Sequence, residues 1–221
     1  MNLPDNLLPP GWYWTGQGLF ALVLFWAIRT APWSRLKDES ALNVWLGACV
    51  LLMGVWSIKT GIKPGLNFHL LGATAMTLMV GPQLAIIGLA IVLTAVTLAG
   101  MSGWDGYGWN ALIMDVLPVT VSYAIYWLAD RKLPNHLFIY IFLSGFFGSA
   151  LAMAVTGLGG TLLLQLSGTY LAAYLYNNYL PYFFLMAWSE AVSTGMAITL
   201  MTVYSPLWLS TFDDARYLKG H

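Results

Sequence analysis

Long apolar stretches separated by short polar ones run along almost the whole chain. A helix needs roughly 20 residues to cross about 30 Å of hydrocarbon, and most of these stretches approach that length. We expect such helices at about residues 15–30, 41–57, 66–80, 83–100, 109–129, 137–166 and 181–204. The third is short, at roughly 15 residues, and is predicted to begin in a re-entrant or buried position. The pattern predicts an all-α fold, a polytopic membrane bundle of about seven transmembrane helices.

The segments outside these stretches are rich in residues that break helices or favour an interface. Pro9 and Pro10 are expected to keep the N-terminal segment 1–14 out of the first helix. Residues 168–179 hold tyrosines and asparagines, a composition typical of a membrane interface rather than of a span. The glycines within 137–178 leave open whether this region holds one helix or two.

Composition agrees with the pattern of apolar stretches. Of the 221 residues, 59% are hydrophobic and 8% charged, and the mean hydropathy is +0.70, which indicates a multi-pass membrane protein in contact with lipid. Nine basic and nine acidic residues give no net charge, so nothing points to nucleic-acid binding. The single cysteine, Cys49, excludes an internal disulfide. The N-terminus has no basic region or small-residue cleavage site, so we expect no signal peptide.

The distribution of basic residues predicts the orientation in the membrane. With seven crossings and the N-terminus outside, most of the lysines and arginines fall on the cytoplasmic side, and only Lys59 and Lys63 lie outside. Eight crossings would weaken this bias. The chain is therefore expected to form one integral-membrane domain, residues 1–221, in the cell (inner) membrane. Its C-terminal tail, residues 205–221, is expected to be cytoplasmic.

Few polar residues lie within the predicted helices, and each needs a partner. Burying an unpaired polar or charged side chain in hydrocarbon costs several kcal/mol. Asn110 and Asp115 lie early in the fifth helix and Glu190 lies near the middle of the seventh, so the two carboxyl groups should face the bundle interior. Either they line a functional polar cavity or they hold helices together by hydrogen bonds, and for Glu190 we favour the structural role.

His69 lies within a turn of the start of the third predicted helix, and it is the first candidate for a metal ligand. Met76 lies on the same face of this predicted helix, about two turns further on. Imidazole with thioether or nitrogen donors suits late first-row metals, above all copper and nickel. Methionine more often packs as a soft apolar residue, and we favour that interpretation for Met76.

Together these residues resemble a known family, the cobalt and nickel permeases of the energy-coupling-factor (ECF) transporters, of the CbiM/NikM type. The resemblance spans most of the chain. It rests on the order and spacing of the opening Met-x-x-Pro-Asp, the Gly-x-x-x-His-Leu-Leu-Gly around His69, Gly81-Pro82, Gly108-Trp109-Asn110, and Glu190 with Thr194.

The resemblance implies a metal site built from the N-terminus. In that family the N-terminal segment folds back into a central cavity, so residues 1–14 would do so here. Met1 would supply the terminal amine, Asn2 its backbone nitrogen, and His69 a distant imidazole. The chain departs from the family at Asn2, where members with nickel or cobalt uptake have histidine. Asp5 and Asn110 match positions that fix the folded-back segment.

The resemblance also implies a function and partners. The chain would be the substrate-binding membrane component of an ECF-type ABC transporter that imports a transition-metal ion of the copper, nickel or cobalt class as its substrate. It would need a transmembrane coupling protein and cytoplasmic ATPases, since it has no phosphate-binding Gly-x-x-x-x-Gly-Lys-Ser/Thr motif of its own. No set of residues indicates an enzyme. The alternative is a divergent relative that binds no metal and acts as a structural or assembly partner of another membrane complex.

Overall fold

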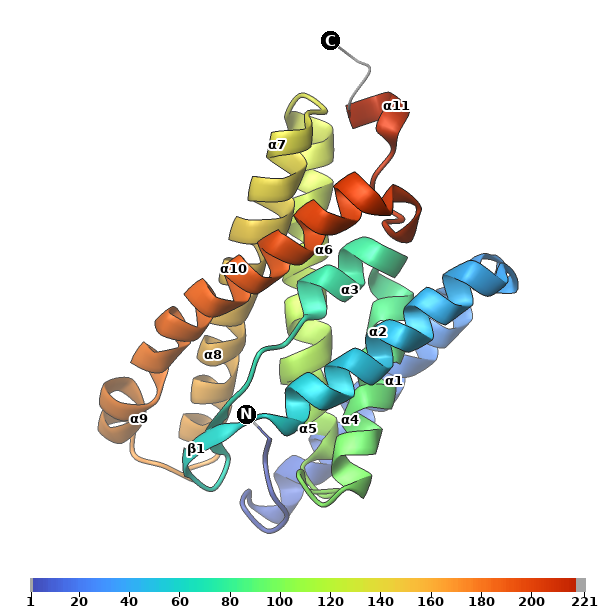
Figure 1. Cartoon of the computed structure of the whole chain (residues 1–221). Coiled ribbons are helices and arrows are strands. Elements are labelled where there is room, and N and C mark those ends of the chain that lie inside the picture. Colours follow the sequence, from blue (N-terminus) through green and yellow to red (C-terminus); the bar gives the residue numbers. More distant parts are fainter. Residues whose placement is uncertain (1, 218–221) are drawn as a thin grey trace.

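The computed structural model describes residues 2–217, and it is a bundle of helices (Figure 1). The N-terminal segment and the chain's last helix lie at opposite ends of this bundle, as Figure 1 shows. The elements are α1 (Pro10–Thr30), η1 (Trp33–Lys37), α2 (Glu39–Ser57), β1 (Thr60–Lys63), β2 (Leu66–Phe68), α3 (Ala73–Val80), α4 (Pro82–Leu98), α5 (Tyr107–Ala111), η2 (Leu112–Val116), α6 (Leu117–Lys132), α7 (Leu137–Ile139), η3 (Tyr140–Phe147), α8 (Gly148–Leu166), α9 (Ala172–Asn178), α10 (Leu180–Tyr204), η4 (Pro206–Trp208) and α11 (Asp214–Tyr217). The segments η2 and η3 are π-helical turns inside longer helices.

Within the described residues, four helices are long and apolar enough to cross a membrane. They are Glu39–Ser57, Tyr107–Lys132, Leu137–Leu166 and Ala172–Tyr204, and Pro82–Leu98 is a shorter apolar helix. Exposed large apolar side chains cover the bundle surface, as expected where lipid replaces water as the solvent. The chain is a multi-pass helical membrane protein.

The third predicted helix, residues 66–80, differs most from the structure. Its first residues form strand β2, which pairs antiparallel with β1, and only Ala73–Val80 are helical. Gly72 has a φ of 64°, a left-handed conformation that ends the extended segment and starts α3. Eight helical residues are only about 12 Å long, so α3 cannot cross the membrane by itself.

Two other boundaries differ from expectation, and the helix predicted at 137–166 is confirmed as one. Helix α1 begins at Pro10, because proline is well suited to the first position of a helix, where no backbone donor is needed. The helix from Leu137 to Leu166 is continuous, and the glycines in it allow close packing instead of a break: a Cβ at Gly157 would collide with the ring of Phe183. Residues 172–178 of the predicted interfacial segment form the short helix α9.

The hairpin is anchored against the start of α10 by aromatic packing. The ring of Phe68 lies 5.3 Å from that of Tyr179, 5.6 Å from that of Tyr182 and 5.3 Å from that of Phe183, measured between ring centroids. Phe68, Tyr179 and Phe183 are buried. Such pairs each contribute about 0.5–1.5 kcal/mol beyond the burial of their area. These ring contacts fix the position of Phe68, the residue before His69.

Helix α3 is held at its N-terminal end by Glu190 of α10. The backbone N–H of Leu71 donates to Glu190 Oε2 at 2.8 Å, and that of Gly72 donates to Oε1 at 2.7 Å. Glu190 is 1% exposed, so two amide donors and the positive end of α3 together stabilise a buried carboxylate. This arrangement agrees with the structural role predicted for Glu190, in which one carboxyl group joins two helices.

The other end of α3 is held by the segment that follows α10. The backbone N–H of Ser210 donates to the carbonyl of Met79 at 2.9 Å, and Thr211 Oγ1 donates to the carbonyl of Leu78 at 2.8 Å. These carbonyls belong to the last turn of α3 and have no partner within the helix. Residues 205–217 are therefore folded onto the bundle instead of forming a free tail, and residues 218–221 of the predicted tail lie outside the described residues.

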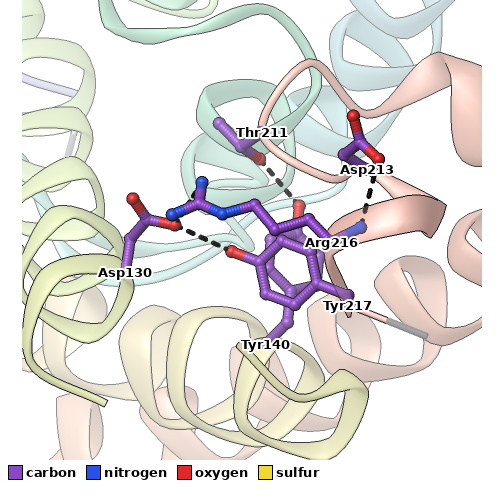
Figure 2. A network of polar contacts seen from close by, with 6 residues as sticks. All are labelled: Asp130, Tyr140, Thr211, Asp213, Arg216 and Tyr217. Atoms are coloured by element: carbon purple, nitrogen blue, oxygen red, sulfur yellow. Dashed lines mark hydrogen bonds and ion pairs between the residues drawn. The ribbon is translucent and has the colours of Figure 1, made fainter. Parts of the chain in front are cut away.

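A polar network closes this end of the bundle (Figure 2). Arg216 Nη1 lies 2.9 Å from Asp130 Oδ1, which also accepts a hydrogen bond from the Tyr217 hydroxyl at 3.1 Å. The Tyr140 hydroxyl and Thr211 Oγ1 share a hydrogen bond of 2.7 Å. The network joins α6, η3 and α11, so the cytoplasmic end predicted from the basic residues is a packed surface.

Substituting Gly108 tests the packing of α5 on α1. A Cβ at Gly108 would collide with the backbone of Gly16 and Gln17, which cannot move without shifting α1. We expect Gly108→Ala to lower the free energy of unfolding by about 1–3 kcal/mol, measured by denaturant unfolding in detergent micelles. Gly18→Ala is the control, because a Cβ there meets nothing within 4 Å. Equal stability of the two variants would contradict this packing.

Substituting Glu190 tests the cap on α3. Glutamine has one acceptor oxygen and presents an amide donor to the second backbone N–H, so one buried donor loses its partner. We expect Glu190→Gln to lower the free energy of unfolding by about 1–3 kcal/mol in the same assay. Glu39→Gln, at the exposed start of α2, should be close to wild type. Glu190→Gln with wild-type stability would show that the two hydrogen bonds are not needed.

Candidate functional site

The N-terminal segment enters the bundle and is buried there. Asn2 and Leu3 are each 3% exposed, although they lie close to the chain's N-terminus. A buried backbone needs partners for every N–H and C=O group. The resemblance implied that residues 1–14 fold back toward a central cavity, and in the structure residues 2–5 lie against the hairpin and the loop before α5.

Two asparagine side chains pair with this backbone in the way that a neighbouring strand would. The N–H of Asn2 donates to Asn67 Oδ1 at 2.8 Å, and Asn67 Nδ2 donates to the Asn2 carbonyl at 3.2 Å. The N–H of Leu3 donates to Asn110 Oδ1 at 2.8 Å, and Asn110 Nδ2 donates to the Leu3 carbonyl at 3.2 Å. Each amide thus satisfies both polar groups of one residue, which fixes the segment in depth and direction.

The loop before α5 completes this docking. The N–H of Gly103 donates to the Leu3 carbonyl at 3.0 Å, and Asp5 Oδ1 accepts from the N–H of Asp105 at 2.8 Å. A side chain at Gly103 would collide with the backbone of Asp5, so glycine is required for this close approach. Asp5 and Asn110 have the positioning contacts that the resemblance implied.

His69 lies directly beside Asn2. It is 2% exposed and sits in the extended segment three residues before Gly72, not within the first turn of a helix as predicted. Its Nε2 is 3.0 Å from Asn2 Oδ1, and its Nδ1 is 2.9 Å from the Leu70 carbonyl. The Trp56 ring packs against the imidazole with 5.0 Å between centroids. The structure thus brings Asn2 and His69 into contact. The resemblance had placed both residues in one site.

The protonation of His69 follows from these contacts. The Leu70 carbonyl can only accept, so Nδ1 has the proton. Burial disfavours the charged imidazolium, and Nε2 is therefore an acceptor with a free lone pair. It faces an oxygen of Asn2, also an acceptor, while Asn2 Nδ2 has no partner among the described residues. Either the amide is turned so that Nδ2 donates to Nε2, or a cation lies between the two acceptors.

The geometry of this pair fits a shared metal ion. Two donors that each lie about 2.1 Å from a metal, at a right angle, are about 3.0 Å apart. His69 Nε2 and Asn2 Oδ1 have that separation. Metal-binding histidines commonly donate the other ring N–H to a backbone carbonyl, as His69 Nδ1 does to Leu70. The separation is thus compatible both with a shared metal ion and with a hydrogen bond from a turned Asn2 amide.

The other predicted residues lie elsewhere or have other roles. Met1 lies outside the described residues. Met76 is not part of the site: its methyl group lies in the core beside Cys49 and Gly88, because α3 turns that side of the helix toward α2 and α4. Asp115 is fully buried in η2, and its carboxyl oxygens have no hydrogen-bond partner within residues 2–217. Glu190 bonds the backbone two and three residues after His69, so it positions that segment.

Asn67 and Trp56 were not predicted as site residues. Asn67 stands two residues before His69, and nothing in the local sequence indicated that its amide would pair with a backbone 65 residues away. Trp56, at the end of α2, also donates from Nε1 to the Leu71 carbonyl at 3.0 Å. Its position at the end of an apolar stretch resembled that of an ordinary interfacial aromatic residue.

Similar proteins are metal transporters. The chain is 28% identical over 180 residues to the "Probable fused nickel transport protein LarMN" of Lactiplantibacillus plantarum, which covers 81% of this chain and 54% of that protein. The chain thus spans about half the length of this relative. A crystal structure described as a transition metal transporter matches with a TM-score of 0.75 and 20% identity, over 92% of this chain and 93% of the other.

A truncated transition metal transporter matches with a TM-score of 0.74 and 21% identity, over 92% of this chain and 99% of the other. These two structures have the same fold as this chain. The relatives are transporters and not enzymes. The model of the family CbiM, described as the cobalt uptake substrate-specific transmembrane region, matches residues 2–208, and the chain belongs to this family.

Proposed function

We propose that the chain is the membrane-embedded, substrate-binding component of an ECF-type importer for a transition-metal ion. The observation that supports this most directly is the buried pair of acceptors, His69 Nε2 and Asn2 Oδ1, 3.0 Å apart. Nitrogen donors with one oxygen suit copper, nickel and cobalt better than magnesium or calcium, which prefer oxygen alone. Family membership and the nickel transport relative agree with a metal of this class.

The proposed ligands come from the two N-terminal residues and from His69. His69 supplies Nε2, Asn2 supplies Oδ1 in place of an imidazole, and Met1 supplies the terminal amine. The backbone nitrogen of Asn2 is the fourth candidate. In the structure its N–H donates to Asn67 Oδ1, so it would have to lose this proton before it could bind a metal. Asn67 Oδ1 would then lose this hydrogen bond, and Asn67 Nδ2 would still hold the segment through the Asn2 carbonyl.

The orientation and partners also belong to this proposal. The end of the bundle that holds the N-terminal segment and the hairpin would face outward, so that the site is reached from outside. The extended segment 69–72 with α3 would make one of seven passes, which puts the network of Asp130, Arg216 and Tyr217 on the cytoplasmic side of the cell membrane. A separate coupling protein and ATPases would supply the energy.

The alternative function is that of a divergent relative that binds no metal. It is favoured by the second way of satisfying the site, in which the Asn2 amide donates to His69 and holds the N-terminal segment as a purely structural contact. The chain would then act as an assembly partner of another membrane complex.

Removing the imidazole separates these functions. We expect His69→Ala to reduce metal binding at least about a hundredfold, because the site loses its one fixed ring donor, as judged by titration of purified protein with Cu²⁺, Ni²⁺ and Co²⁺. His136→Ala is the matched control, since His136 lies in the loop before α7 at the other end of α6. If wild type and His69→Ala retain the same negligible metal, the transport function is wrong.

Changing the N-terminus tests the other ligands. We expect Asn2→His to bind Ni²⁺ at least about tenfold more tightly than wild type, because imidazole is the stronger donor for this metal. A one-residue extension before Met1 should weaken binding in both proteins, because it displaces the terminal amine. Titration calorimetry measures both effects. An extended protein with unchanged affinity would remove the terminal amine from the ligand set.

A further inference from the structure

A cavity of about 460 Å³ lies directly outside the candidate site. Asn2 and Asn67 line it on the inner side, and the hairpin residues Lys59 and Lys63 line its rim together with Met101. Most residues of the rim are exposed, so the cavity is open to solvent. Its volume is in the range of small-molecule pockets and is far larger than the roughly 30 Å³ that one water occupies.

The charges around this cavity are positive. Two lysines and no acidic residue are among its described lining residues. Lys59 Nζ donates to the Met101 carbonyl, and Lys63 Nζ lies 4.1 Å from the centre of the Tyr174 ring. Burial lowers the pKa of Lys59, which is the direction expected for an ammonium group that no carboxylate stabilises. Both lysines are held at the rim without an acidic partner in the described structure.

Asp5 belongs to the docked segment and Asp105 contacts it, but neither lines this cavity. Asp105 lines a different cavity, of about 380 Å³, with Trp14 and Trp104. The carboxylate of Asp5 accepts from the Asp105 backbone. Neither lines the cavity beside Asn2, so the approach to the site repels a free divalent cation and attracts an anion.

The proposed ligand set is compatible with an anionic complex. The described residues supply two donors in contact, His69 Nε2 and Asn2 Oδ1, and the second is a neutral amide oxygen. The Met1 amine and the Asn2 backbone nitrogen are the other proposed donors, and a metal that prefers six ligands has open positions beside these four. Carboxylates from a small chelating molecule would fill these positions, and the cavity is adjacent to Asn2.

We propose that the substrate is a metal complex of net negative charge, in which a carboxylate-bearing chelator occupies the cavity between Lys59 and Lys63 and the metal reaches His69. The two ammonium groups bind the carboxylates, and the Asn2 and Asn67 amides line the passage to the imidazole. This inference rests on the proposed function, since it names the form in which the metal arrives.

The test compares complexes of one metal with different charge. Wild-type protein in detergent or nanodiscs is titrated with Ni²⁺ alone, with Ni²⁺–citrate, which is anionic, with Ni²⁺–ethylenediamine, which is cationic, and with citrate alone. We expect Ni²⁺–citrate to bind at least about tenfold more tightly than the cationic complex at low salt, and the preference to shrink as salt is raised. The cationic complex binding as well as the anionic one would overturn the inference.

Substitutions at the rim locate the effect. Lys59→Gln with Lys63→Gln should remove most of the preference for the anionic complex, whereas Lys59→Arg with Lys63→Arg should keep it. Lys37→Gln is the control. Lys37 precedes α2 and the rim lysines follow α2, so they are separated by the length of this helix, about 29 Å. The variant with both arginines also shows whether substitution of these two lysines by itself disturbs folding. A glutamine pair that folds and retains the full preference would overturn the inference.

The outcomes also separate this inference from the proposed function. Tight binding of free Ni²⁺ or of the cationic complex, lost in His69→Ala, supports the metal site and rejects the chelate. Citrate that binds equally well without metal likewise rejects the chelate as the substrate. If no form of the metal binds wild type more tightly than it binds His69→Ala, both the inference and the proposed function fail.

Discussion

Every polar group of a backbone buried inside a membrane bundle must be paired, and this constraint decides how the N-terminal segment is held. Residues 2–5 belong to neither a helix nor a sheet. The side-chain amides of Asn67 and Asn110 take the place of two residues of a neighbouring strand, and each pairs both with an N–H and with a C=O. This pairing places Asn2 against His69 with little freedom to move.

The same constraint explains the segment that leads into α3. Residues 69–72 are extended inside the bundle, where backbone that is neither helix nor sheet is tolerated only with specific partners. Glu190 pairs with Leu71 and Gly72, and Trp56 pairs with Leu71, so side chains from α10 and α2 hold the end of this segment. His69 therefore lies on backbone that is neither helix nor sheet but is held in place, just before the start of α3.

The site and the two ends of α3 are connected through a few rigid contacts. His69 lies on the segment that Glu190 caps, and the last turn of α3 is paired with Ser210 and Thr211 in the segment after α10. Helix α10 and its continuation therefore hold both ends of an eight-residue helix. Any displacement of His69 by a bound metal would act on this short helix, whose far end contacts the network around Tyr140.

The sequence by itself determined the class of protein and much of the candidate site. Apolar stretches set the positions of the long helices, since hydrocarbon requires about the same length of apolar chain in any context. The spacing of motifs around His69, Asn110 and Glu190 indicated the family. Tertiary structure alone decided that residues 66–72 are extended, that Met76 belongs to the core, and that Asn67 pairs with Asn2. These features depend on partners 65 or more residues away or on the side of a helix that faces a neighbour, and no local pattern of apolar and polar residues records either.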